Sequence, residues 1–208
     1  GDGSGLTNLN VDAGQLTGQL TGDGSGLTNL NAAQLVGQIP PSALGGAWKL
    51  GGNAGTIPAQ SFLGTTDNQP LEFKVGGQRA LRLEPNAESP WSPNVIGGHA
   101  GNIVSNGVYG ATIGGGGGGS FGFKPNRVGE WYGTVVGGSG NTASGGWSTA
   151  MGLNTTASGR YSTAMGQDTT ASGNWSTAIG SFTSASGGES TAMGYETAAR
   201  GDTSTAMG

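Results

Sequence analysis

A strict 14-residue repeat constrains the fold of this chain more than any other feature. From residue 143 to residue 208, one glycine recurs every fourteen residues without a slip. The column comprises Gly152, Gly166, Gly180, Gly194 and Gly208. A fixed short period indicates identical units stacked on one another. A unit this short fits one β-coil of two brief strands and two tight turns, so we predict an all-β solenoid. We place the glycines at one turn, because glycine adopts positive φ without steric cost.

The large apolar residues of the repeat form a second column, directly before that glycine. This column comprises Met151, Met165, Ile179, Met193 and Met207. Residues two apart in a strand share a face, so Ser148 and Ala150 point to the opposite side. We predict that the Met/Ile column is the buried structural core, stacked at about 4.8 Å per coil. One thin coil buries too little apolar surface to offset backbone ordering, so we expect further chains beside it, in closed cyclic symmetry.

The pattern S-T-A-M-G-x-x-T-T-A-S-G resembles the head repeat of the trimeric autotransporter adhesins, the YadA-like head. The family repeat has an S-V-A-I-G core, from which this chain departs by Thr for Val and Met for Ile in most copies. The resemblance implies a parallel left-handed β-roll, three chains around one axis, and a fibre on a bacterial surface. It covers residues 143–208 well and residues 94–142 loosely.

Two further segments precede the coils. In residues 1–46, the sequence GDGSGLTNLN recurs after 21 residues, and we interpret these repeats as a fibre shaft. The Asp-Gly-Ser-Gly within it is read as a tight turn, because it has too few carboxylates for a calcium site. In residues 47–90, alternating apolar residues from Leu71 to Leu83 flank Gly76-Gly77 and predict a β-hairpin. This module resembles bacterial and phage tail-fibre-domain proteins, which points to a shaft rather than an activity.

Residues 91–142 are predicted to be irregular head coils with loop insertions, before the regular coils of residues 143–208. Short motifs ending in Gly97, Gly114 and Gly137 echo Thr-Ala-Met-Gly at wider spacings. Extra residues in a repeat form loops, often on one face. The longest insertion, residues 115–132, is also the most aromatic, and loops on rigid scaffolds often bind. The candidate binding loop comprises Phe121, Phe123, Trp131 and Tyr132.

A second candidate surface is an aromatic column at another position of the repeat. Trp147, Tyr161 and Trp175 share this column with Glu189 and Thr203. A position that accepts Glu is not deep core, so these rings should stack along an exposed edge. They could bind a ligand such as a sugar, or form a packing ladder between chains.

Two further patterns are weaker candidates. The tripeptide Arg200-Gly201-Asp202 spells an integrin motif at a turn. The Thr149 column is assigned to the coil interior or an interface rather than to an ice-binding array.

Composition excludes several function classes. Only 10% of residues are charged, and the net charge of −4 provides no basic patch for nucleic acid. No apolar run is long enough to span a membrane. His99 is the only histidine, which excludes a His-based triad or multi-His metal site within one chain. We therefore expect no enzyme, cofactor or metal. A polysaccharide-degrading tailspike remains an alternative, because distant carboxylates could meet in the fold.

These observations together predict a structural and adhesive segment of an extracellular or cell-surface homotrimeric fibre. Weak contacts to a host-surface protein or glycan would add through threefold avidity. The alternative is a receptor-binding tail fibre or spike of a phage or contractile injection machine. Because the chain begins on Gly-Asp-Gly and ends on a repeat boundary, we expect it to be part of a longer protein.

Overall fold

The computed structural model describes residues 51–57, 60–86, 92–118, 122 and 124–208. The chain divides into two compact units, residues 1–56 and 57–208, and every described strand lies in the second. The described residues contain strands and no helix, which confirms the all-β prediction. The predicted shaft repeats lie outside the described residues. The division of the chain into four segments stays a prediction.

Two sheets form the second unit, and we call them the long sheet and the short sheet. The long sheet has ten strands in the order β1-β2-β3-β5-β7-β9-β11-β13-β15-β17. They are β1 (Leu71–Val75), β2 (Gln78–Glu84), β3 (Asn94–Gly97), β5 (Thr112–Ile113), β7 (Thr134–Ser139), β9 (Thr149–Leu153), β11 (Thr163–Gln167), β13 (Thr177–Ser181), β15 (Thr191–Tyr195) and β17 (Thr205–Met207). The short sheet has seven strands in the order β16-β14-β12-β10-β8-β6-β4. They are β4 (Ile103–Val104), β6 (Arg127–Val128), β8 (Thr142–Ala143), β10 (Thr156–Ala157), β12 (Thr170–Ala171), β14 (Ser184–Ala185) and β16 (Ala198–Ala199).

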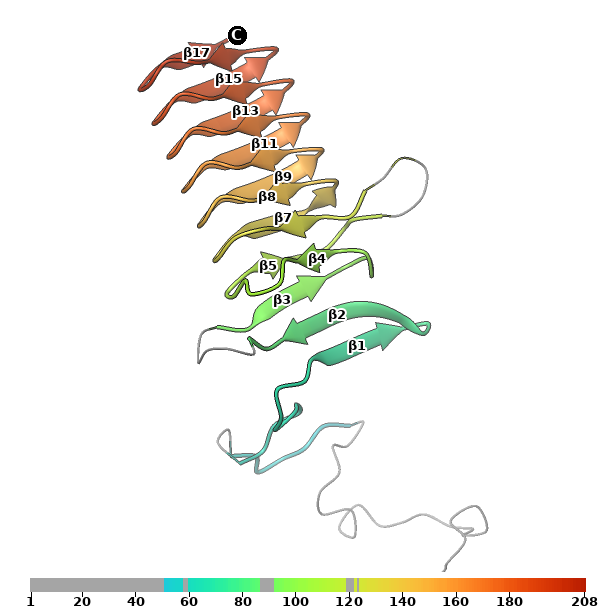
Figure 1. The fold of residues 1–208 in the computed structure, drawn as a ribbon. Coiled ribbons are helices and arrows are strands. Elements are labelled where there is room, and N and C mark those ends of the chain that lie inside the picture. Colours follow the sequence, from blue (N-terminus) through green and yellow to red (C-terminus); the bar gives the residue numbers. More distant parts are fainter. Residues whose placement is uncertain (1–50, 58–59, 87–91, 119–121, 123) are drawn as a thin grey trace, which may run out of the picture. The chain divides into compact units, whose positions relative to one another are not determined.

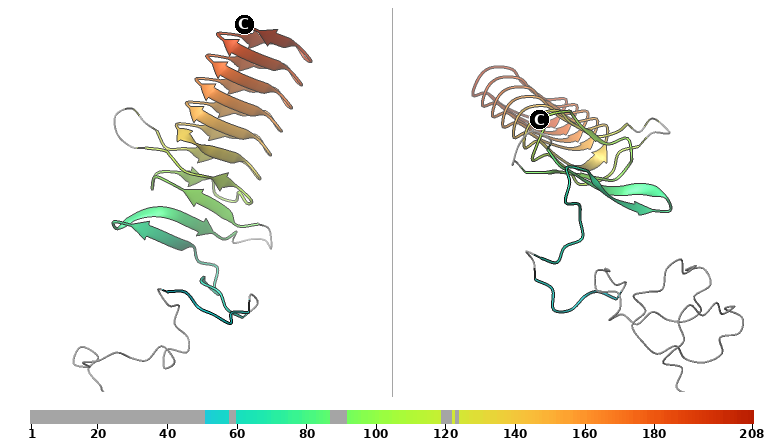
Figure 2. Two further views of the ribbon diagram at one scale, coloured as in Figure 1. Left: turned by 180° about the vertical axis from the view of Figure 1, so that it is seen from behind. Right: turned by 60° about the horizontal axis from the view of Figure 1, so that its bottom comes forward.

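Each 14-residue coil contributes one strand to each sheet. In one coil, β9 runs along the long sheet, the chain bends at Asn154, and β10 returns along the short sheet. A second turn then leads back to β11. Neighbouring coils pair in parallel with an offset of one repeat, so that Thr149 pairs with Thr163. Figures 1 and 2 show the resulting stack of narrow coils, which confirms the predicted solenoid.

The glycine column that begins with Gly152 lies inside the long-sheet strands and not at the turn, where the sequence placed it. Gly152 is the fourth residue of β9, and the bend comes at Asn154, which has a φ of 54°. The same offset holds for Gly166, Gly180 and Gly194, while Gly208 follows β17. Their φ values of 119–131° suit glycine alone. A Cβ on Gly152 would also overlap the carbonyl oxygen of Gly166 in the next coil. The glycine therefore allows close stacking of coils rather than forming the turn.

The space between the two sheets is filled by small side chains. Alanines from both sheets are fully buried there: Ala143, Ala150, Ala157, Ala164, Ala171, Ala178, Ala185 and Ala192. Buried Ser and Thr columns complete the interior: Ser148, Ser162, Ser176, Ser190, Thr155, Thr169 and Thr183. The Met/Ile column alternates with these alanines and therefore points to the other side of the long sheet. In the single chain this column is therefore not in the coil interior, and its burial as a structural core stays a prediction.

Buried asparagines stack in the irregular coils, and the sequence analysis missed them. Asn102, Asn126 and Asn141 are fully buried in successive coils. Asn102 Oδ1 accepts a hydrogen bond from the Asn126 amide nitrogen, and Asn126 Oδ1 accepts one from the Asn141 amide nitrogen. The Asn141 Nδ2 donates to the carbonyls of Gly137 and Gly152, at 2.8 and 2.7 Å. This asparagine ladder thus pairs backbone groups where the coils vary in length.

The predicted hairpin is confirmed and extends the long sheet. Strands β1 and β2 pair antiparallel around Gly76 and Gly77, whose φ values of 56° and 77° are both positive. Strand β2 then pairs antiparallel with β3, whereas all later pairs are parallel. The hairpin is therefore the first layer of the same sheet.

Candidate functional site

The outer face of the long sheet, which points away from the short sheet, is an apolar stripe. Its exposed apolar side chains along the coils include Val136, which is 51% exposed, and Met193, which is 41% exposed. Met151, Met165 and Ile179 are half-buried in the single chain. The Thr149 column lies beside them on the same face, so it is not in the coil interior. We call this surface the Met/Ile face.

The hairpin continues the Met/Ile face beyond the coils. Residues paired across a sheet point to the same side, and the register links Leu83 through Val95, Thr112 and Thr134 to Thr149. On the hairpin, Leu71 pairs with Leu83 and Phe73 pairs with Leu81. The apolar face of the hairpin and that of the coils therefore form one surface.

The predicted aromatic column is a continuous ring stack at the second turn of the coils. Trp147, Tyr161 and Trp175 follow Tyr132, with ring centres 5.2–5.6 Å apart and planes within 21°. All four rings sit on residues with φ between 55° and 59°, which turns the side chains along one edge. Neighbouring rings cover one another's faces, so the stack exposes mainly ring edges. Its role as a ligand or interface stripe stays a prediction.

The predicted binding loop is divided by a strand. β6 (Arg127–Val128) belongs to the short sheet and separates residues 115–126 from Trp131 and Tyr132. Trp131 and Tyr132 therefore lie at the second turn, where Tyr132 begins the ring stack and Trp131 stacks on Tyr109 at 5.7 Å. Phe121 and Phe123 lie outside the described residues. The prediction of one continuous loop was wrong, because a strand of two residues leaves no recognisable pattern in the sequence.

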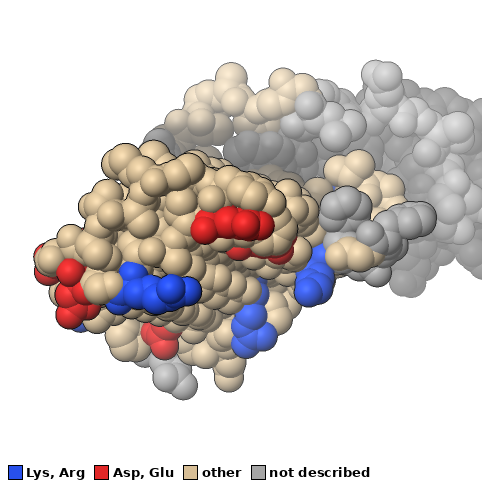
Figure 3. Space-filling view, turned by 90° about the horizontal axis from the view of Figure 1, so that it is seen from above, with Lys and Arg blue, Asp and Glu red and all other residues tan. Residues whose placement is uncertain are grey.

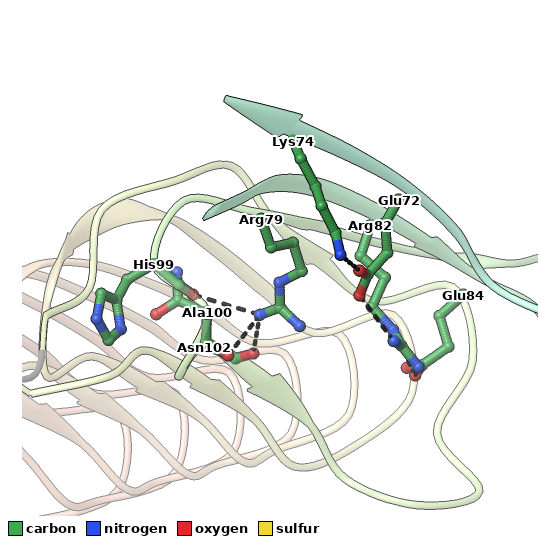
Figure 4. A network of polar contacts seen from close by, with 8 residues as sticks. All are labelled: Glu72, Lys74, Arg79, Arg82, Glu84, His99, Ala100 and Asn102. Carbon is green, nitrogen blue, oxygen red and sulfur yellow. Dashed lines mark hydrogen bonds and ion pairs between the residues drawn. The ribbon is translucent and has the colours of Figure 1, made fainter. Parts of the chain in front are cut away.

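A polar network fastens the hairpin to the first coil (Figure 4). Nη2 of Arg79 donates to the backbone carbonyls of Ala100 and Asn102, both at 2.9 Å, and to that of His99 at 3.3 Å. Arg82 forms ion pairs with Glu72 at 3.0 Å and Glu84 at 2.8 Å. The hydrogen bond from Arg82 lowers the pKa of Glu72 below its ordinary value, against an opposing effect of desolvation. The Arg79 hydrogen bonds hold the hairpin to the first coil, whereas the ion pairs of Arg82 lie within the hairpin.

The other candidate residues within the described ranges lie apart from one another. His99 is exposed, and its Nδ1 accepts a hydrogen bond from the Gly101 amide at 3.0 Å. Asp202 of the Arg-Gly-Asp tripeptide accepts a 2.7 Å hydrogen bond from Gly188 through Oδ1, so one of its oxygens is engaged with the neighbouring coil. In the described part of the chain, no three His, Cys, Asp or Glu residues cluster as metal ligands would. Charged side chains are sparse on the face seen in Figure 3. None of the described residues belongs to a helix able to cross a bilayer.

One family model describes two copies of the YadA head domain repeat. It matches this chain three times, at residues 143–168, 157–183 and 185–208. These matches cover nearly all of the regular coils. Residues 143–208 are therefore similar to YadA head domain repeats. Such repeats are structural and non-enzymatic. The stacked β-coils of residues 143–208 have the repeating architecture that such a family model describes. Searches among curated proteins and among solved structures found no match to the chain.

Proposed function

We propose that this chain is a structural and adhesive segment of a homotrimeric fibre on a bacterial surface. The observation that carries the proposal is the Met/Ile face, which leaves large apolar side chains exposed or half-buried on the regular coils and on the hairpin. Monomeric proteins rarely expose a continuous apolar surface of this kind, so a partner should cover it. The YadA head repeats support a second and third copy of the same chain as that partner.

The opposite side of each coil supports the same assignment. The outer face of the short sheet presents Thr156, Ser158 and their equivalents in neighbouring coils, which are small and polar. A face of this composition is suited to water, so the long sheet is the side that turns toward the fibre axis. In this arrangement the Met/Ile column is the core of the trimer rather than of the coil. The turns and the short sheet then remain available for adhesion, with each site present three times.

The mass of the full chain in solution tests the proposal. We expect light scattering to give about three times the 20.3 kDa chain mass. Replacing Met165 by Lys should dissociate the trimer, because a charge in an apolar interface would be buried without a partner. Replacing Thr170 by Lys, on the outer face of the short sheet, is the matched control and should leave the mass unchanged. A wild-type chain that is folded and monomeric would refute the trimer.

A further inference from the structure

A groove lies at the second turn of the coils, beside the ring stack. Backbone hydrogen bonds between coils place Trp131, Gly146, Arg160 and Asn174 in one column of four successive coils. Gly146 contributes no side chain, and a Cβ built there would meet only the Trp131 carbonyl oxygen, at 4.0 Å. The missing side chain leaves a slot between Trp131 and Arg160. These two residues are two coils apart, which is about 10 Å at the usual strand spacing.

One wall of the slot is an aromatic face. Trp131 stacks on Tyr109 of the preceding coil with planes at 15°, so its opposite face is directed toward Gly146. Trp131 is 44% exposed. Trp147 also lines the groove. This wall differs from the ring stack, where each face is covered by the next ring.

The other wall is a guanidinium. The Arg160 Cζ lies 4.9 Å from the Trp147 ring centre and 5.1 Å from the Tyr161 ring centre. Among the described residues no carboxylate forms an ion pair with Arg160, and its guanidinium donates no hydrogen bond. Its donors can therefore serve a ligand. Asn174, Ser158 and Glu130 also line the groove and offer an amide, a hydroxyl and a carboxylate.

We propose that this slot binds an acidic sugar, a pyranose that carries one carboxylate or sulfate. The apolar face of the ring would lie on Trp131, the anion would accept hydrogen bonds from Arg160, and ring hydroxyls would reach the polar rim. An acidic peptide fits less well, because an Asp or Glu side chain has no ring face to place on the indole. The slot is shallow, so binding at one copy is weak.

The position of the slot suits the proposed fibre, on which the biological meaning of this inference rests. Within each turn, the column of Arg160 comes after the short-sheet strand and before the ring stack. It therefore lies on the side of the turn away from the Met/Ile face. Packing through the long sheet leaves it open, and a trimer would present three slots in each head.

Saturation-transfer NMR on the full chain tests the slot. The probes are 3′-sialyllactose, a chondroitin sulfate disaccharide, neutral lactose and a short polyglutamate peptide. We expect one or both acidic sugars to bind at millimolar concentration, and which of them binds distinguishes carboxylate from sulfate. Gly146→Asn should fill the slot and weaken binding more than tenfold, and Arg160→Gln should do the same. Gly188→Asn is the matched control, because Gly188 lies in the same column but outside the slot, and it should bind within twofold of the wild type.

Several results would overturn the assignment. They are the absence of binding by both acidic sugars, equal binding of lactose, binding of polyglutamate alone, and equal effects of Gly146→Asn and Gly188→Asn. Far-UV circular dichroism of each variant shows whether it is folded, and Arg160→Gln provides a test that leaves the backbone unaltered. The mass of the same sample separates the two proposals. A monomer that binds through Arg160 refutes the trimer alone, and a trimer that binds none of the sugars refutes the slot alone.

Discussion

Replacing Asn141 by Ala should be among the most damaging single changes in the solenoid. The side chain is fully buried. Its Nδ2 donates to the carbonyls of Gly137 and Gly152, and its Oδ1 accepts from the Thr155 amide at 3.0 Å and from Thr155 Oγ1 at 2.7 Å. Truncation removes the hydrogen-bond partner of two buried groups of Thr155 and of the half-buried carbonyls of Gly137 and Gly152. At about 1–3 kcal/mol for each unpaired group, and with partial relaxation, we expect a loss of about 3–5 kcal/mol.

Urea unfolding followed by far-UV circular dichroism measures this loss. With an m-value of about 2 kcal/mol/M, the midpoint should fall by about 2 M. Asn141→Thr should be milder, because Thr155 occupies the same column in the next coil. Asn174→Ala is the matched control, since this exposed side chain also bonds a neighbouring coil, through the Arg160 amide at 3.0 Å, and should cost less than about 1 kcal/mol. If Asn141→Ala costs no more than this control, the asparagine ladder does not stabilise the coils as argued.

Three further outcomes follow from the same geometry. Gly166→Ala should lower the free energy of unfolding by about 3–5 kcal/mol, because it combines an unfavourable φ with a clash against the next coil. Gly146→Ala is the control and should be nearly neutral in the same urea titration. Ala164→Leu should cost about 3 kcal/mol by overpacking the fully buried interior, and an unchanged midpoint would show that the coils can expand. Because the folded-state pKa of Glu72 is lowered, its contribution is present above the pKa of the unfolded chain, about 4.3, and is lost as the pH falls through the folded value. Thermal melts from pH 6 to pH 3 should therefore show a shallower loss of stability in Arg82→Gln than in the wild type.

The parts of the fold that were predicted correctly depend on local spacing. The 14-residue period places Thr149 beside Thr163, and the structure has that register. The hairpin followed from alternating apolar residues around Gly76, and the aromatic column from its repeat position. In each case the signal is a spacing within one or two coils, so no long-range information is needed.

The parts that were missed depend on how separated segments meet. The asparagine ladder joins Asn102, Asn126 and Asn141 over separations of 24 and 15 residues, and these irregular intervals hide the column. The slot likewise depends on the absence of a side chain at Gly146 between residues of two other coils. Strand β6 was missed because two residues carry no periodicity of their own. Sequence spacing shows neither an irregular column nor an empty space.

The sequence by itself determined that this chain forms stacked coils, how neighbouring coils are aligned, and which residues share a column. It did not determine which side of the long sheet faces inward, because a strand has two faces and alternation fits either of them. The larger apolar residues favoured the Met/Ile side as the interior. In the tertiary structure the two sheets of a coil leave room between them for Ala, Ser and Thr, so Met165 faces outward and Ala164 is buried. That spacing arises only once both sheets are assembled, and it turns the largest apolar side chains of the repeat toward a partner.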